Sequence, residues 1–206
     1  DWSLYVTPLR WTSCRADSEA AKHGSTVQSY LEEAIRPALA ALEGRISALR
    51  KSEDAGDVFL LADMEDVLRE TRRSFGLSLQ AIWERQLRRY LQGCAEALRP
   101  GSDLAVKATK AGWSGLLDLF EELRGIRLQS FPSFAELDVL HLLGNACRHG
   151  EGPSLHALAG RCPDLWPWPW PDPPPPSAAG LDVSLDRLER FVEAIAGFWS
   201  DATYIY

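Results

Sequence analysis

Residues 134–150, FAELDVLHLLGNACRHG, are the stretch that most restricts how this chain can fold. Apolar residues recur through it at helical spacing and cover most of the helix circumference: Leu137, Val139, Leu140, Leu142, Leu143 and Ala146. A helix that is apolar on nearly every side must be surrounded by other elements. We therefore expect this segment to be a buried helix inside a larger packed domain.

One line of polar residues interrupts this apolar surface. Asp138, His141, Asn145 and His149 follow one another at intervals of three or four residues, so they share a face, and Arg148 lies beside them. An unpaired buried polar group costs about 1–3 kcal/mol, so this face must meet a cleft, a partner or other polar groups. A histidine at a helix C-terminus can act as acid or base near neutral pH, with Asn145 orienting it or holding a phosphate. The alternative is structural: His149 bonds last-turn carbonyls and Asn145 satisfies a neighbouring loop.

The rest of the chain also has helical periodicity. Apolar spacing predicts helices over residues 18–52, 57–74, 78–98, 113–123, 153–162 and 184–202. Pro37 should kink or split the first of these, and Gly76 should separate the second from the third. No segment has a convincing strand pattern. The prediction is an all-α fold, an antiparallel bundle of four to five long helices plus short ones.

The domain organisation is predicted from composition along the chain. Residues 1–16 are too apolar for a free tail, and we expect an arm that packs on the body or exchanges with a second subunit. Residues 17–206 are expected to form a single helical-bundle domain. Within it, residues 163–180 form a connector rich in proline and tryptophan, and its 163–176 part should adopt polyproline II structure. Its tryptophans should either cover the bundle's own apolar surface or act as a docking strap.

Composition excludes several classes of protein. The net charge of −7 argues against a general nucleic-acid coat, although a small basic patch remains compatible with it. No apolar run approaches the roughly 18 residues of a membrane span, and no signal peptide is evident, so we expect a cytoplasmic protein with no membrane association. Four widely spaced cysteines indicate reduced, mostly buried thiols.

We expect no metal and no cofactor. The nearest set of potential ligands is Cys147, His149, His156 and Cys162, and it lacks the paired spacing of structural zinc sites. A Gly-rich phosphate loop, a Ser/His/Asp triad and paired catalytic carboxylates are also not evident.

A second polar feature is a set of arginines around the predicted junction of two helices. It comprises Arg69, Arg72, Arg73, Arg85, Arg88 and Arg89. These arginines could bind an RNA backbone. The alternative is a solvated surface, with Glu84–Arg88 and Glu65–Arg69 as ion pairs one turn apart. If this helix packs beside residues 134–150, Glu84 and Arg88 could complete a site with the polar line.

The ending Asn145-Ala-Cys-Arg-His149-Gly, followed by a short helix that begins with Pro and Ser, resembles the signature helix of HEPN domains. These are all-α bundles of prokaryotic toxin–antitoxin and antiviral defence systems. The resemblance covers about 20 residues. In the family motif an arginine is followed by a polar residue and then, a few positions later, by histidine. Asn145 matches the polar residue and His149 the histidine, whereas Gly144 occupies the position of the arginine.

The resemblance implies a homodimer that binds RNA or cleaves it without metal at a cleft between subunits. His149 would then be the acid or base and Asn145 its orienting partner. Arg148 or Arg88 would replace the missing arginine as a phosphate contact, with His141, Asp138 and Glu84 as further substrate-binding residues. Because the arginine is absent, ribonuclease activity is an open expectation. The alternative is a non-catalytic helical module that binds a protein partner.

Overall fold

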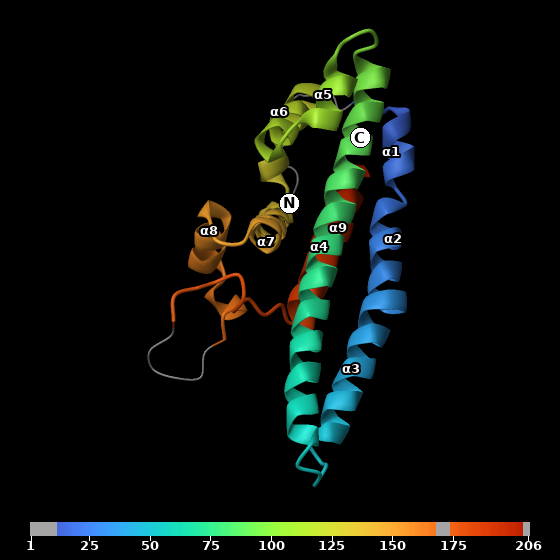
Figure 1. Cartoon of the computed structure of the whole chain (residues 1–206). Helices are drawn as coiled ribbons and strands as arrows, with labels where there is room; N and C mark the ends of the chain where they lie inside the picture. The colour runs from blue at the N-terminus through green and yellow to red at the C-terminus, as the bar shows by residue number, and fades with distance from the viewer. Residues whose placement is uncertain (1–11, 168–173, 204–206) are drawn as a thin grey trace. The chain divides into compact units, whose positions relative to one another are not determined.

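The structure, a computed structural model, describes residues 12–167 and 174–203. Within these residues it contains helices and no strand: α1 (Arg15–Ala20), α2 (His23–Tyr30), a π-helical turn (Leu31–Ile35), α3 (Arg36–Leu49), α4 (Asp57–Leu98), α5 (Leu104–Lys110), α6 (Trp113–Arg124), a 3₁₀ turn (Leu128–Ser130), α7 (Phe134–His149), α8 (Pro153–Arg161), a 3₁₀ turn (Pro163–Leu165) and α9 (Leu185–Thr203) (Figure 1). The predicted all-α helical bundle is confirmed. No helix of the described part is long and apolar enough to cross a membrane.

The chain divides into two compact units, each assembled from separate stretches of sequence. Unit 1 contains the described residues of 1–26, 82–135 and 194–206, and unit 2 contains residues 27–81 and 136–193 within the described range. Helices α2, α4, α7 and α9 each contribute residues to both units.

Unit 1 has an aromatic core. The second half of α4 supplies Trp83 and Tyr90, and α9 supplies Phe198 and Trp199, all at most 2% exposed. The ring centroids of Trp83 and Phe198 are 4.8 Å apart and those of Tyr90 and Trp199 are 5.4 Å apart, both edge to face. This is the arrangement that aromatic quadrupoles favour. The second half of α4 therefore has its aromatic side chains in the core of unit 1.

A charged cluster is buried beside this core. The Asp17 carboxylate accepts hydrogen bonds from the Tyr90 hydroxyl at 2.8 Å, from the Cys14 backbone N–H at 2.7 Å and from the Arg124 guanidinium at 3.3 and 3.4 Å. Both charged side chains are only 1% exposed. Burial raises the pKa of Tyr90, so its hydroxyl stays protonated and serves as a donor to Asp17. These bonds fix α1 to α4 and α6.

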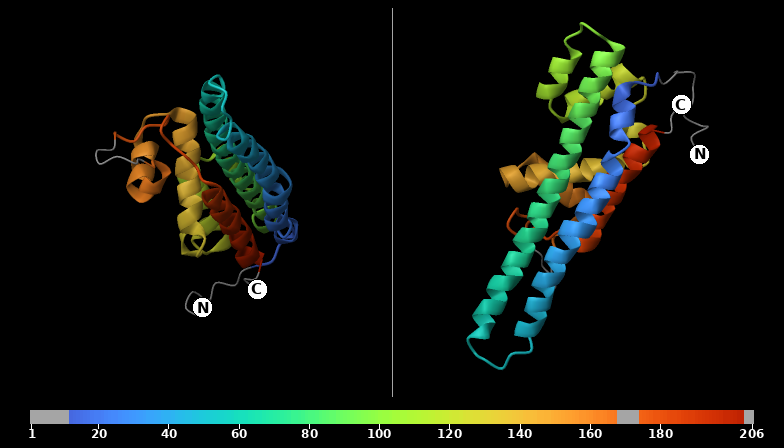
Figure 2. Two further views of the ribbon diagram at one scale, coloured as in Figure 1. Left: turned by 90° about the horizontal axis from the view of Figure 1, so that it is seen from below. Right: turned by 90° about the vertical axis from the view of Figure 1, so that its right-hand side faces the viewer.

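Unit 2 contains a helical hairpin made by α3 and the first half of α4, which run antiparallel and side by side (Figures 1 and 2). Ion pairs join the two helices, with Arg72 to Glu43 at 2.8 Å and Arg50 to Glu65 at 2.7 Å. The π-helical turn at Leu31–Ile35 comes just before Pro37. Proline has no N–H to donate, which explains the altered hydrogen bonding in the preceding turn. The chain thus stays helical through Pro37, with a π-helical turn before it instead of the predicted kink or split.

The predicted helix break at Gly76 is wrong. Helix α4 runs without interruption from Asp57 to Leu98. A Cβ atom at Gly76 would lie 3.0 Å from Leu143 Cδ2, so the missing side chain allows α7 to approach α4 closely. Gly125 and Gly150, by contrast, follow α6 and α7 with φ angles of 69° and 67°, as expected for glycines that end helices.

The connector is only partly as predicted. Residues Pro163–Leu165 form a 3₁₀ turn rather than polyproline II, and Trp168 and Trp170 lie outside the described residues. Trp166 donates from Nε1 to the Ser177 carbonyl at 2.7 Å, which joins the two ends of the connector. The predicted arm also lies mostly outside the described residues. Its Thr12 carbonyl accepts a hydrogen bond from Arg124 at 3.1 Å.

An arginine of α9 holds the connector to α7 within unit 2. Arg187 contacts Glu136 of α7 at 3.2 Å and Asp164 of the connector at 2.8 Å. Burial by itself would raise the pKa of Asp164, but the hydrogen bond and positive charge of Arg187 outweigh this effect, so the pKa is lowered. Ser184 caps α9, because its hydroxyl accepts a hydrogen bond from the Arg187 backbone N–H at 3.1 Å.

Candidate functional site

The polar line predicted for residues 134–150 lies along one side of α7 in unit 2. Asp138, His141 and Asn145 are half-buried, whereas Arg148 and His149 are exposed. The opposite side of the helix carries Leu140 and Leu143, which are fully buried. The polar residues are therefore half-buried in the middle of α7 and exposed at its C-terminal end. We call Asp138, His141, Asn145, Arg148 and His149 the α7 polar face.

Three of these side chains form a chain of hydrogen bonds. Arg148 Nη2 donates to Asn145 Oδ1 at 3.3 Å, and Asn145 Nδ2 lies 3.0 Å from His141 Nε2. Because Arg148 occupies the amide oxygen, the amide nitrogen is the atom that faces His141. An amide N–H can only donate, so His141 Nε2 is the acceptor of this hydrogen bond. Arg148 therefore orients Asn145, and Asn145 contacts the His141 ring.

Asp138 fixes the neighbouring helix. Its carboxylate pairs with Arg161 at the end of α8 at 2.5 Å. This ion pair joins the end of α8 to α7 within unit 2. His149 is exposed at the end of α7. Its ring is therefore accessible to solvent.

Gly144, at the position where the HEPN motif has an arginine, lies against α4. A Cβ atom there would lie 2.6 Å from Gln80 Cγ and 2.9 Å from Gln80 Cδ. Gln80 belongs to α4 and is 1% exposed. A side chain at position 144 would therefore point between α7 and α4 and away from the α7 polar face. Arg148 instead reaches back one turn, donating from Nε to the Gly144 carbonyl at 3.1 Å.

Glu84 and Arg88 are engaged with each other in unit 1, whereas the α7 polar face belongs to unit 2. Arg88 Nη2 lies 2.6 Å from Glu84 Oε1, and its Nη1 donates to the Ala108 carbonyl at 3.0 Å. The structure thus contains the predicted Glu84–Arg88 ion pair. It does not assemble these two residues with Asn145 and His149 in one unit.

Most of the other arginines in the predicted basic set also have acidic partners. Arg72 pairs with Glu43, and Arg73 pairs with Glu70. Arg69 pairs with Asp66, so the predicted Glu65–Arg69 pair is wrong: Glu65 pairs with Arg50 of α3. This distribution favours a solvated surface over a phosphate-binding groove.

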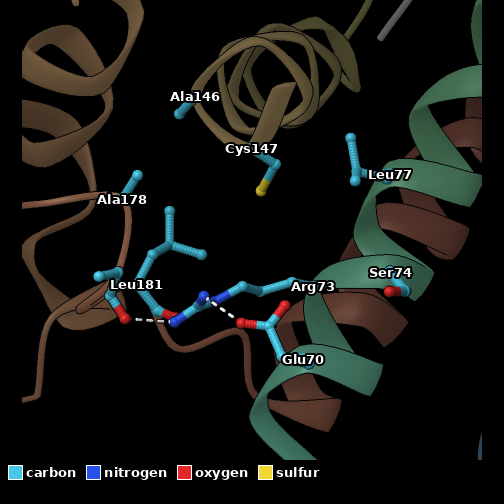
Figure 3. Close-up of a pocket in the computed structure, with 9 residues that line it drawn as sticks. Glu70, Arg73, Ser74, Leu77, Ala146, Cys147, Ala178 and Leu181 are labelled. Carbon is cyan, nitrogen blue, oxygen red and sulfur yellow. Dashed lines mark hydrogen bonds and ion pairs between the residues drawn. The ribbon is translucent and has the colours of Figure 1, made fainter. Parts of the chain in front are cut away.

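Unit 2 contains a pocket that was not predicted from the sequence, and the Cys147 side chain points into it (Figure 3). The pocket has a volume of about 250 Å³. Its lining comprises Glu70, Arg73, Ser74, Leu77, Ala146, Cys147, Ala178, Ala179 and Leu181. Burial raises the pKa of Cys147, so its thiol remains protonated.

Arg73 is not available to bind a ligand in this pocket, because its guanidinium donates to the carbonyls of Leu181 and Ala179 and pairs with Glu70. These interactions fasten the connector to α4. The pocket could not be found from spacing, because its walls come from three separate segments of the chain.

No group of three or more His, Cys, Asp or Glu side chains in the described part of the chain is arranged to hold a metal ion. No protein-family model, no curated protein and no solved structure matches the chain. The α7 polar face, with its ordered Arg148–Asn145–His141 chain and the exposed His149, is therefore the candidate site on structural grounds alone.

Proposed function

We propose that this chain is a HEPN-like helical protein of a prokaryotic defence or toxin–antitoxin system that acts in the cytoplasm and binds RNA through the α7 polar face. The observation that supports this most is the ordering of Arg148, Asn145 and His141 beside an exposed His149. A guanidinium held at a helix end is suited to a phosphate, because it offers several N–H donors in one plane. An imidazole and an amide beside it supply further hydrogen bonds.

The proposed activity is binding without cleavage. Stabilising the charge that develops on a phosphate during cleavage requires cationic donors aimed at it. The motif position that supplies such a donor is Gly144, and its Cβ direction is blocked by Gln80. Arg148 already donates one hydrogen bond to Asn145, so only part of its guanidinium would contact the phosphate. In a homodimer, two such faces would line one cleft and double the number of phosphate contacts.

Replacing Arg148 by alanine is expected to weaken the binding of a fluorescently labelled single-stranded RNA about tenfold or more, as loss of one charged hydrogen bond of about 1.5 kcal/mol or more implies. The slope of log affinity against log salt should fall in magnitude by about 0.7, the value for one phosphate contact on a single strand. Fluorescence anisotropy at several salt concentrations measures both quantities. Incubating the same samples with EDTA and analysing the RNA on a gel tests for metal-free cleavage.

The matched control for this experiment is Arg45→Ala, which removes one exposed positive charge from α3 in the same unit. It should leave the affinity within about twofold, because it changes only the general charge of the protein. Equal losses for Arg148→Ala and Arg45→Ala would contradict a specific site at α7. Cleavage in EDTA that disappears in His149→Ala would replace the binding proposal with a nuclease.

A non-catalytic interaction module is the second candidate, and one observation favours it. Phe59 is 78% exposed and Val58 is 65% exposed at the start of α4. The partner that we propose for this apolar tip is a second copy of the chain. Phe59→Ser should then convert a dimer into a monomer in a measurement of mass in solution. Val106→Ser removes a similarly exposed apolar residue of α5 and should leave the mass unchanged.

A further inference from the structure

Two cysteines far apart in the sequence meet in unit 1. The Sγ atoms of Cys14 and Cys94 are 3.8 Å apart, although the residues are 80 positions apart in the chain. Cys14 precedes the first turn of α1, and Cys94 lies in the last part of α4. Cys94 is fully buried, whereas Cys14 is half-buried and therefore accessible to a small solute.

The two thiols are brought together by contacts that do not involve sulfur. Asp17, three residues after Cys14, is bonded to Tyr90, one helical turn before Cys94. Gly93 lets the helices approach, since a Cβ atom there would lie 3.0 Å from Ala16 Cβ. The close approach of the sulfurs is therefore imposed by the packing of α1 against α4.

A positive charge lies beside both sulfurs. Arg124 Nη1 is 3.8 Å from Cys14 Sγ and 3.9 Å from Cys94 Sγ, and the arginine is 4% exposed. A nearby guanidinium stabilises a thiolate, which is the reactive form of cysteine. Burial raises the pKa of Cys94, and Arg124 opposes that rise. Cys94 is fully buried and Cys14 is only half-buried, so Cys14 is the thiol that a solute reaches first.

We propose that Cys14 and Cys94 form a reversible disulfide when a hydroperoxide oxidises Cys14. The Cys14 sulfur attacks the peroxide, the O–O bond breaks, and one oxygen stays on sulfur as a sulfenic acid. The other oxygen leaves and takes up the thiol proton. The Cys94 sulfur then attacks the Cys14 sulfur, the S–S bond forms, and the S–O bond breaks. The oxygen departs as water with the Cys94 proton, so two electrons pass from the two thiols to the peroxide.

The geometry requires only a small movement. A disulfide bond is about 2.0 Å long, so the sulfurs must approach each other by a little less than 2 Å. Side-chain rotation and a slight shift of the short helix α1 can supply that. The product would join the beginning of α1 covalently to α4, which in the reduced protein are held together by the Asp17 contacts.

The test uses the full chain with Cys147→Ser and Cys162→Ser, which leaves only this pair of thiols. Hydrogen peroxide is expected to lower the intact mass by about 2 Da and to remove both reactive thiols, and dithiothreitol should restore them. The oxidised form should melt about 5–10 °C higher than the reduced form, because the bond closes a long loop.

Two further samples make the result decisive. In Cys94→Ser, made in the same background, Cys14 should stop at sulfenic acid and react with dimedone. Wild-type protein treated with peroxide, alkylated and mapped by mass spectrometry should show the Cys14–Cys94 peptide pair, independently of how well the serine variants fold. Conversion of Cys14 to sulfinic acid while Cys94 remains a free thiol would overturn the proposal, and so would preferential pairing with Cys147 or Cys162.

Discussion

Replacing Asp17 by alanine is expected to lower the free energy of unfolding by about 3–5 kcal/mol, the usual cost of breaking a buried ion pair from one side. Arg124 is 4% exposed, and in this variant it loses the carboxylate with which it pairs. The Tyr90 hydroxyl also loses its acceptor. Tyr90 and Arg124 would then be buried polar groups that have each lost a partner. Urea denaturation followed by circular dichroism measures the change, and the slope of the transition shows whether it remains two-state.

Glu19→Ala is the matched control, since Glu19 also pairs with an arginine but its side chain is 53% exposed. Exposed ion pairs contribute about 0–1 kcal/mol, so this variant should be nearly as stable as wild type. The double variant Asp17→Leu with Arg124→Leu removes both buried charges and should recover much of the loss. A loss below about 1 kcal/mol for Asp17→Ala would show that the cluster is not a main support of unit 1.

Gly144→Arg introduces the arginine that the HEPN motif places before Asn145, and it is expected to cost about 3 kcal/mol or more while producing no RNA cleavage. The reason is steric. The first side-chain carbon at position 144 would already lie 2.6 Å from Gln80 Cγ, which is near the α4 backbone rather than at the free end of a side chain. The helices must separate or Gln80 must leave its position. Thermal unfolding and the gel assay in EDTA test the two parts of this prediction.

The control for Gly144 is another helical glycine. Gly44 lies in α3 and a Cβ atom there would meet nothing within 4 Å. Gly44→Ala should stabilise the protein by about 0.5–1 kcal/mol, because alanine loses less backbone entropy in a helix. Gly144→Ala should destabilise it, and adding Gln80→Ala should relieve most of that loss. A Gly144→Arg variant as stable as wild type would contradict the packing described for α7 and α4.

Several features of the fold could be predicted from local sequence. The apolar spacing of residues 134–150 predicted the helix seen as α7, and that of residues 184–202 predicted the helix seen as α9. These signals are local because helical hydrogen bonds and caps join residues that are three or four positions apart. The expectation that Asp138, His141 and Asn145 share one face followed from the same periodicity.

Other features were decided by tertiary packing. Gly76 predicted a helix break but stands inside α4, because a residue on another helix, Leu143, occupies the space of its side chain. Gly144 also stands inside a helix, and there Gln80 of α4 occupies the space of the side chain. A glycine can either adopt a left-handed backbone conformation in a turn or let two helices approach closely. The sequence alone does not distinguish these two cases.

The amino-acid sequence by itself therefore determined most of the helical segments, although not α5, and which polar residues share a face of α7. Tertiary structure decided which distant groups meet: Asp17 with Arg124, Cys14 with Cys94, and Arg148 with Asn145 instead of an arginine at position 144. The physical reason is the sequence separation of the residues that interact. Helix formation depends on neighbours within about four residues, whereas a buried charge, a thiol pair or a blocked Cβ depends on chain segments that only the packed fold brings together.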